Sequence, residues 1–189
     1  MLRVALMAVL ISLSGCATVV APFSKQPTDL NHGKRTWGAA IEDQSIETKT
    51  RINLKRAGPP LSDQHIVVVS FNGNVLLAGQ VASEDIKTQA GNIAERIRHV
   101  RHLHNELSVV GAGSTLARAN DSWITSKVKT RLAFNTEAPA SRTKVVTENG
   151  IVYLFGLLTR EEADAVVAQV QKVYGVQKIV KIIEYIENP

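Results

Sequence analysis

The sequence predicts an α+β fold made of two tandem copies of one α-β-β-α-β unit. In each copy we expect a three-stranded sheet covered by two helices on one face. Three observations predict this. The 189 residues contain one pattern of apolar residues written twice. Each copy has an Asn-Gly pair between two β-rich runs, which is the strongest short signal of a hairpin. Each copy also has two segments with apolar residues at helical spacing.

The composition is that of a globular chain with a moderate positive charge. Charged residues make up 21% and apolar residues 44%, which excludes a disordered chain, a collagen-like fibre and a polytopic membrane protein. Lys and Arg number 22 against 17 Asp and Glu, so the formal net charge is +5. This excess favours an acidic partner, either nucleic acid or an anionic membrane surface, and does not choose between them.

The first fifteen residues are predicted to be a signal peptide. Met1-Leu2-Arg3 is a short basic start, and residues 4–13 are apolar except for Ser12. Ten residues are too few to span a bilayer, which needs roughly 20, but they fit the apolar region of a secretory signal. The next residues, Leu13-Ser14-Gly15-Cys16, resemble the lipobox of bacterial lipoproteins.

The lipobox resemblance implies that cleavage follows Gly15 and that Cys16 carries a covalent lipid. Cys16 is the one cysteine of the chain, so an intrachain disulfide is excluded. The alternative is a buried free cysteine behind an ordinary signal peptide. Ala17 stands where enteric-type lipoproteins carry an inner-membrane Asp, which favours a lipid-anchored chain on the periplasm-facing side of the outer membrane. Residues 16–42, which contain several Pro and Gly, are predicted to be a lipidated N-terminus and flexible tether.

The two domains are predicted at residues 43–109 and 121–187, with residues 110–120 as a linker. Asp43 and Asp121 open the copies and stand where an N-cap belongs. A first helix of about three turns follows in each copy. Its apolar positions correspond at an offset of 78: Ile46, Thr50 and Leu54 in the first copy, and Ile124, Val128 and Leu132 in the second.

A hairpin, a second helix and a last strand complete each copy. The hairpin turns are Asn72-Gly73 and Asn149-Gly150, where a type I′ turn needs a positive φ at both residues. The second helices begin after Ser83 and Thr159. The last strands are the alternating runs at residues 100–109 and 176–185.

This order of elements resembles the BON domain. The motifs that carry the resemblance are the Asn-Gly hairpin, the glycine that closes the second strand (Gly79 and Gly156), and a Gly-Val loop before the last strand. The second copy keeps the loop, and the first has His99 in place of its glycine. A lipobox, a tether and two copies are similar to the dual-BON outer-membrane lipoproteins. This resemblance implies binding of anionic phospholipid through the second domain and a role in envelope integrity.

Both faces of each predicted sheet are apolar. In the first copy Ile66, Val68, Val75 and Leu77 share one face, while Val67, Val69, Phe71, Leu76 and Ala78 share the other. Two helices cover one face, so the other face must either be covered by something else or remain an exposed apolar surface that binds a partner. Either the two domains pack on one another or on the tether, or a separate protein or a second copy covers it. The last possibility defines an alternative function, a periplasmic adaptor that docks an envelope protein partner.

The first helix of the second copy carries a second stripe beside its core stripe. Trp123, Lys127, Thr130 and Phe134 lie at i, i+4, i+7 and i+11, and Arg131 flanks them. Trp suits the headgroup depth of a membrane, and Lys or Arg near an anionic leaflet each add ~1 kcal/mol. These five residues are the predicted phospholipid-binding site. The alternative is that Trp123 and Phe134 pack against the first domain.

No catalytic motif is present, so an enzyme is not expected. His102 and His104 alternate on one strand, but no third ligand is placed beside them and Arg98 and Arg101 repel a cation, so neither a metal nor a cofactor is expected. Nucleic acid is not an expected partner, because the basic residues are scattered and the lipobox directs export. The two remaining classes are a lipid-binding lipoprotein and the adaptor.

Overall fold

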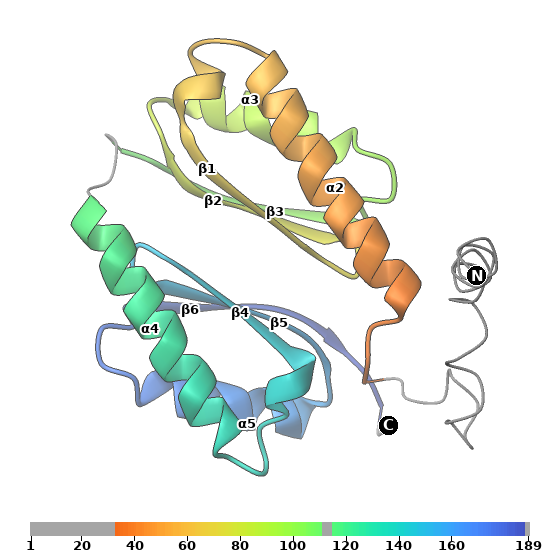
Figure 1. Ribbon diagram of the computed structural model, residues 1–189, viewed down its shortest axis with the longest axis vertical. Coiled ribbons are helices and arrows are strands. Elements are labelled where there is room, and N and C mark those ends of the chain that lie inside the picture. Colours follow the sequence, from red (N-terminus) through yellow and green to blue (C-terminus); the bar gives the residue numbers. More distant parts are fainter. Residues whose placement is uncertain (1–32, 111–114, 188–189) are drawn as a thin grey trace, which may run out of the picture. The chain divides into compact units, whose positions relative to one another are not determined.

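A computed structural model of the chain describes residues 33–110 and 115–187, which form two three-stranded sheets. The predicted signal peptide, Cys16 and most of the predicted tether lie outside the described residues. Figure 1 shows that each sheet has two helices on one face. The predicted α+β class and the α-β-β-α-β order are confirmed in both copies.

The first domain contains the helices α2 (Trp37–Arg56) and α3 (Glu84–Glu95) and the strands β1 (His65–Phe71), β2 (Asn74–Val81) and β3 (His102–Val109). A short 3-10 helix, η2 (Leu61–Asp63), leads into β1. The central strand β2 pairs antiparallel with β1 and parallel with β3. The helix α3 is therefore the crossover that a parallel pair requires.

The second domain repeats this topology. Its helices are α4 (Thr115–Ala133) and α5 (Arg160–Gln171), and its strands are β4 (Thr143–Glu148), β5 (Ile151–Leu158) and β6 (Lys178–Tyr185). The 3-10 helix η3 (Ala140–Arg142) precedes β4. The strand β5 pairs antiparallel with β4 and parallel with β6. Thr159 and Glu162 form the predicted capping box at the start of α5.

Both Asn-Gly pairs form the predicted tight turns. The φ angles are 51° and 75° at Asn72 and Gly73, and 50° and 71° at Asn149 and Gly150. Positive φ at both central residues is the conformation of a type I′ turn, whose twist matches that of the flanking strands. His99 also has a positive φ, 73°, in the place where the second domain has Gly175 with φ 97°.

The first helices begin earlier than the sequence predicts. Thr36 is the N-cap of α2, and its hydroxyl accepts a hydrogen bond from the Ala39 N–H at 3.1 Å. The helix α4 begins at Thr115, inside the predicted linker 110–120. The expectation that Asp43 and Asp121 are N-caps is therefore wrong, and both residues lie within their helices. The helices are 20 and 19 residues long, well beyond three turns.

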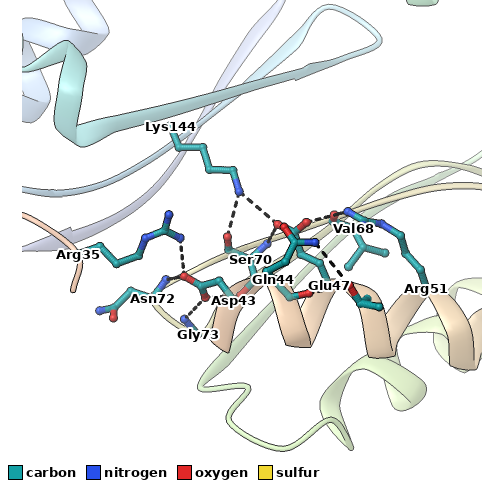
Figure 2. Close-up of polar contacts among 11 residues, drawn as sticks. Arg35, Asp43, Gln44, Glu47, Arg51, Val68, Ser70, Asn72, Gly73 and Lys144 are labelled. Atoms are coloured by element: carbon teal, nitrogen blue, oxygen red, sulfur yellow. Dashed lines mark hydrogen bonds and ion pairs between the residues drawn. The ribbon is translucent and has the colours of Figure 1, made fainter. Parts of the chain in front are cut away.

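The two aspartates instead hold the hairpin turns. The Asp43 carboxylate accepts hydrogen bonds from the backbone N–H groups of Asn72 at 2.8 Å and Gly73 at 2.9 Å. Figure 2 shows these contacts together with the Arg35 guanidinium, which also reaches Asp43. Asp121 accepts the corresponding bonds from Asn149 and Gly150, both at 2.8 Å. Each first helix is thus fastened to its hairpin by one buried carboxylate.

The helix-covered face of each sheet forms a separate core. In the first domain Ile46 and Leu54 of α2 pack with Val68, Val75 and Leu77 of the sheet. The equivalent core of the second domain contains Ile124, Val128 and Leu132 of α4. These positions follow the predicted stripes, so the assignment of this face from the sequence is confirmed.

The other faces of the two sheets share one apolar cluster. Leu76 and Phe71 of the first sheet belong to the same buried group as Tyr153 and Phe155 of the second. The rings of Phe71 and Phe155 have centroids 6.2 Å apart. Of the alternatives for covering these faces, the structure therefore supports packing of one domain on the other.

Polar contacts also join the two domains. The Gln80 side-chain amide donates to Glu148 at 2.9 Å, and Arg101 forms an ion pair with Glu184 at 3.0 Å. Lys144 reaches from β4 to the Ser70 carbonyl, as Figure 2 shows. The adaptor hypothesis required a free apolar sheet face. Among the described residues these faces are occupied, which removes the surface on which that hypothesis depended.

Candidate functional site

The predicted site residues come together on one groove of the second domain. This groove has a volume of about 740 Å³ and lies between α4 and the C-terminal end of α5. All five predicted residues line it: Trp123, Lys127, Thr130, Arg131 and Phe134. The structure therefore brings together the side chains that the sequence singled out, and none of them is left elsewhere.

The position of these residues follows from the way α4 packs. Ile124, Val128 and Leu132 are almost completely buried against the second sheet and fix the rotation of the helix. The neighbouring stripe is consequently turned toward solvent. Trp123 is 47% exposed and Phe134 is 87% exposed. Neither belongs to the cluster shared by the two sheets, so the alternative that they pack against the first domain is wrong.

Lys127 lies over the Trp123 ring, with its Nζ atom 3.5 Å from the ring centroid. The two residues are one helical turn apart, so their side chains meet on the surface of α4. A cation over an indole face is attracted by the negative face of the ring. This contact holds an ammonium group directly beside the aromatic surface of the groove.

The groove also contains side chains from the end of α5 and the turn after it, which were not predicted from the sequence. Lys172 is the C-cap of α5, and Tyr174 follows in the turn that leads to Gly175. Both line the groove, and Tyr174 is 87% exposed. A tyrosine before a glycine was visible in the sequence, but only the packing of α5 against α4 places it in the same groove as Trp123.

The groove combines three aromatic rings with three cations. Lys127, Arg131 and Lys172 line it, and no Asp or Glu is among the lining residues. The equivalent positions of α2 in the first domain hold Ser45 for Trp123 and Asn53 for Arg131. The two domains therefore share a fold but present different surfaces at this place.

Such a surface suits a ligand in which an apolar part lies next to anionic groups. Aromatic side chains with large exposed areas bind at the boundary between water and hydrocarbon. A guanidinium can bind a phosphate through two parallel hydrogen bonds, and an ammonium binds it as a point charge. The groove offers both kinds of contact within one helix and the adjacent turn.

The described residues contain no cluster of three or more His, Cys, Asp or Glu that could hold a metal ion. The Nδ1 atom of His102 lies 3.1 Å from Asn74 Oδ1. Burial lowers the pKa of His104 below its usual value, against the opposing effect of Glu106.

Within the described part of the chain, no helix has the length and apolar character that crossing a membrane requires.

Comparison with protein families matches the BON domain twice, at residues 42–111 and 120–187. The chain belongs to the DolP-like family of proteins with two BON domains. It is 32% identical to the outer membrane lipoprotein DolP of Haemophilus influenzae, over 94% of this chain and 92% of that protein. It is 35% identical to a 21 kDa hemolysin of Actinobacillus pleuropneumoniae, over 81% of this chain and 79% of that protein.

Among solved structures, this BON-domain chain is similar to the C-terminal domain of CdsD, a structural protein of the type III secretion system of Chlamydia trachomatis. The two share 17% identity with a TM-score of 0.30, and the match covers 77% of this chain and 67% of that chain. A likeness at this level carries no argument about function.

Proposed function

We propose that this chain is a non-enzymatic, lipid-anchored outer-membrane protein whose second BON domain binds anionic phospholipid. The observation that carries the proposal is the groove on α4, with three exposed aromatic residues and three cations and no lining carboxylate. The relationship to an outer membrane lipoprotein supports the outer-membrane location. The lipobox at Cys16 supports a covalent anchor that holds the domains on the periplasmic side.

The contact is expected to be measurable by itself and stronger when the chain is anchored. Three cations near an anionic leaflet contribute roughly 3 kcal/mol, at about 1 kcal/mol each. Partial insertion of Trp123 and Phe134 adds apolar burial of a similar size. Attachment through Cys16 raises the local concentration of lipid, so that a contact of this strength is occupied. Binding of lipid in this groove is the step through which we propose that the chain supports envelope integrity.

Vesicle flotation of the unanchored chain tests the lipid contact. The protein is residues 16–189 with Cys16→Ser, which keeps every described residue and carries no lipid. We expect it to float with phosphatidylglycerol vesicles and not with phosphatidylcholine vesicles. We also expect flotation to fall with salt, because exposed charges are screened over ~8 Å at physiological ionic strength.

Two sets of variants identify the surface. Trp123→Glu, and separately Lys127→Glu with Arg131→Glu, should weaken flotation while the protein stays folded, since these side chains are exposed. The matched control is Lys49→Glu with Asn53→Glu, which places the same charges at the equivalent positions of α2. Equal flotation of the α4 variant and the parent, or a parent that ignores anionic lipid, would refute the proposal.

The anchor has a separate test. In the full-length chain, Cys16→Ser should prevent lipid attachment and shift the protein from the outer-membrane fraction to an uncleaved or soluble periplasmic form. Metabolic labelling with an alkyne fatty acid should mark the parent and not the variant. A variant that still fractionates fully with the outer membrane shows that Cys16 is not needed for attachment.

A further inference from the structure

The start of α2 carries a second exposed apolar pair, which the α4 groove does not include. Trp37 is 88% exposed and Ile41 is 70% exposed. They are one helical turn apart and so lie on the same side of α2. No other described part of the first domain exposes an aromatic ring to this degree. A large apolar pair of this kind on a soluble domain marks a surface that contacts something else.

Trp37 also borders a basic groove of about 620 Å³. Five cations line this groove, and no carboxylate does: Lys34, Arg35, Lys129, Arg142 and Lys144. Three of them are held by acids on neighbouring elements, namely Arg35 by Asp43, Arg142 by Glu162 and Lys144 by Glu47.

The other two cations are available to a ligand. Lys34 and Lys129 are exposed, and neither makes an ion pair within the described residues. The surface therefore presents an indole ring, a branched aliphatic side chain and two free ammonium groups. This combination of apolar insertion and unpaired positive charge fits an anionic lipid surface better than a neutral apolar partner.

The position of this surface in the chain decides which occupant it meets. Twenty residues, 17–36, separate Cys16 from Trp37. The sequence predicts a flexible tether here, and a flexible chain of this length has an end-to-end distance of ~25 Å and an upper limit of ~70 Å. If Cys16 is anchored, as the proposed function states, the start of α2 is always within this distance of lipid headgroups. No free protein partner has a comparable local concentration.

We infer that Trp37 and Ile41, with Lys34 and Lys129, form a second membrane-contact surface that docks on the anionic bilayer beside the lipid anchor. It shares no lining residue with the α4 groove. The inference rests on the anchoring part of the proposed function but not on the α4 contact. A chain with two such surfaces and one covalent anchor has its domains held against the membrane at more than one point.

The two tryptophans of the chain allow each surface to be observed alone. Trp37 and Trp123 are the only ones in the sequence, and both are exposed. Trp123→Phe leaves Trp37 as the reporter, and Trp37→Phe leaves Trp123. Cys16 is the single cysteine, so residues 16–189 can be coupled to vesicles through a maleimide phospholipid. This coupling reproduces the anchor whatever the affinity of the α4 groove.

The measurement is quenching of each reporter by brominated phosphatidylcholine in vesicles that also contain phosphatidylglycerol. We expect quenching and a blue shift for Trp37 as well as for Trp123. Quenching of Trp123 without Trp37 would overturn the second surface and leave the α4 contact intact. Quenching of Trp37 without Trp123 would support the second surface and refute the α4 contact. If neither is quenched, both fail.

Variants in the Trp37 reporter chain identify the contributing side chains. Ile41→Ser, and separately Lys34→Glu with Lys129→Glu, should reduce the fraction of Trp37 that is quenched by about half or more. The matched control is Ile52→Ser, an exposed isoleucine near the other end of the same helix and outside the proposed surface. A blue-shifted Trp37 emission already present without vesicles would mean that the chain itself or a second copy covers this surface, and would overturn the inference.

Discussion

Replacement of Asp43 by alanine is expected to loosen the link between α2 and its hairpin. In the folded chain the Asp43 carboxylate accepts hydrogen bonds from the Asn72 and Gly73 N–H groups, from the Ser70 hydroxyl at 2.6 Å and from Arg35 at 2.6 Å. Asp43→Ala leaves the two backbone donors of the turn without an acceptor, in a conformation that the strands on either side hold in place.

The size of the loss follows from this set of partners. A buried donor left unsatisfied costs about 1–3 kcal/mol, so two of them together with the Ser70 hydroxyl predict a loss of about 3–5 kcal/mol in the free energy of unfolding. The described contacts of Asp121 are the two bonds from Asn149 and Gly150, without counterparts of the Ser70 and Arg35 bonds, so a smaller loss is expected for Asp121→Ala.

The same carboxylate predicts an acid dependence. Burial by itself raises the pKa of Asp43, but the hydrogen bonds from Gly73, Ser70, Asn72 and Arg35 outweigh it and hold that pKa below 3.8. A group whose pKa is lowered by folding stabilises the fold fully above its unfolded pKa, and this contribution is lost as the pH falls through the folded pKa. The contribution of Asp43 is therefore complete above about pH 4 and disappears in stronger acid.

Urea unfolding followed by circular dichroism measures both effects. The parent, Asp43→Ala and Asp43→Asn are compared at pH 7 and at pH 3. Asp164→Asn, at an exposed position of α5, serves as the charge-matched control. A loss below 1 kcal/mol for Asp43→Ala, or an unchanged acid dependence for Asp43→Asn, would show that the carboxylate does not hold the turn.

Three further outcomes are expected. Gly150→Val, and likewise Gly73→Val, should lower the melting temperature, because a β-branched residue is strained at φ near +70°; unchanged melting would argue against the type I′ turns. His99→Gly should raise the free energy of unfolding by about 0.5–1 kcal/mol, because His99 has φ 73°, where glycine is less strained. A lower free energy of unfolding in urea for this variant would contradict the expectation. Burial, reinforced by nearby carboxylates, raises the pKa of Tyr153 to about 12. Absorbance at 295 nm should therefore show a tyrosine titration step near that pH, and Tyr153→Phe should remove it. The free energy of unfolding should fall as the pH rises from about 10, because the unfolded tyrosine loses its proton first.

The local pattern of the sequence was sufficient for the repeated unit. The pairs Asn72-Gly73 and Asn149-Gly150 favour positive φ at two successive residues, which is the conformation of a type I′ hairpin turn and of few other local structures. Because a two-residue turn fixes the register, the residues that share each sheet face followed by counting. The exposed stripe on α4 was also predictable, since Ile124 and Leu132 fix the rotation of the helix and leave Trp123 beside the core.

The helix starts were not predictable in this way. Asp43 and Asp121 have the right residue type for an N-cap, and an N-cap also accepts hydrogen bonds from backbone N–H groups. In the structure these carboxylates accept such bonds from a hairpin about 30 residues later in the chain, so Thr36 caps α2 instead. Local sequence does not say which backbone donors a carboxylate will meet.

The sequence by itself determined the elements, their order, the turns and the two apolar faces of each sheet, because these depend on backbone conformation and on alternation along a few neighbouring residues. Only the tertiary structure decided what each second face meets. Phe71 and Phe155 lie in different domains, and their contact depends on how the sheet surfaces of the two folded domains fit together. The same holds for the groove, where Tyr174 joins Trp123 because α5 packs beside α4. Contacts between residues distant in the chain arise from packing of whole surfaces, and no local pattern encodes them.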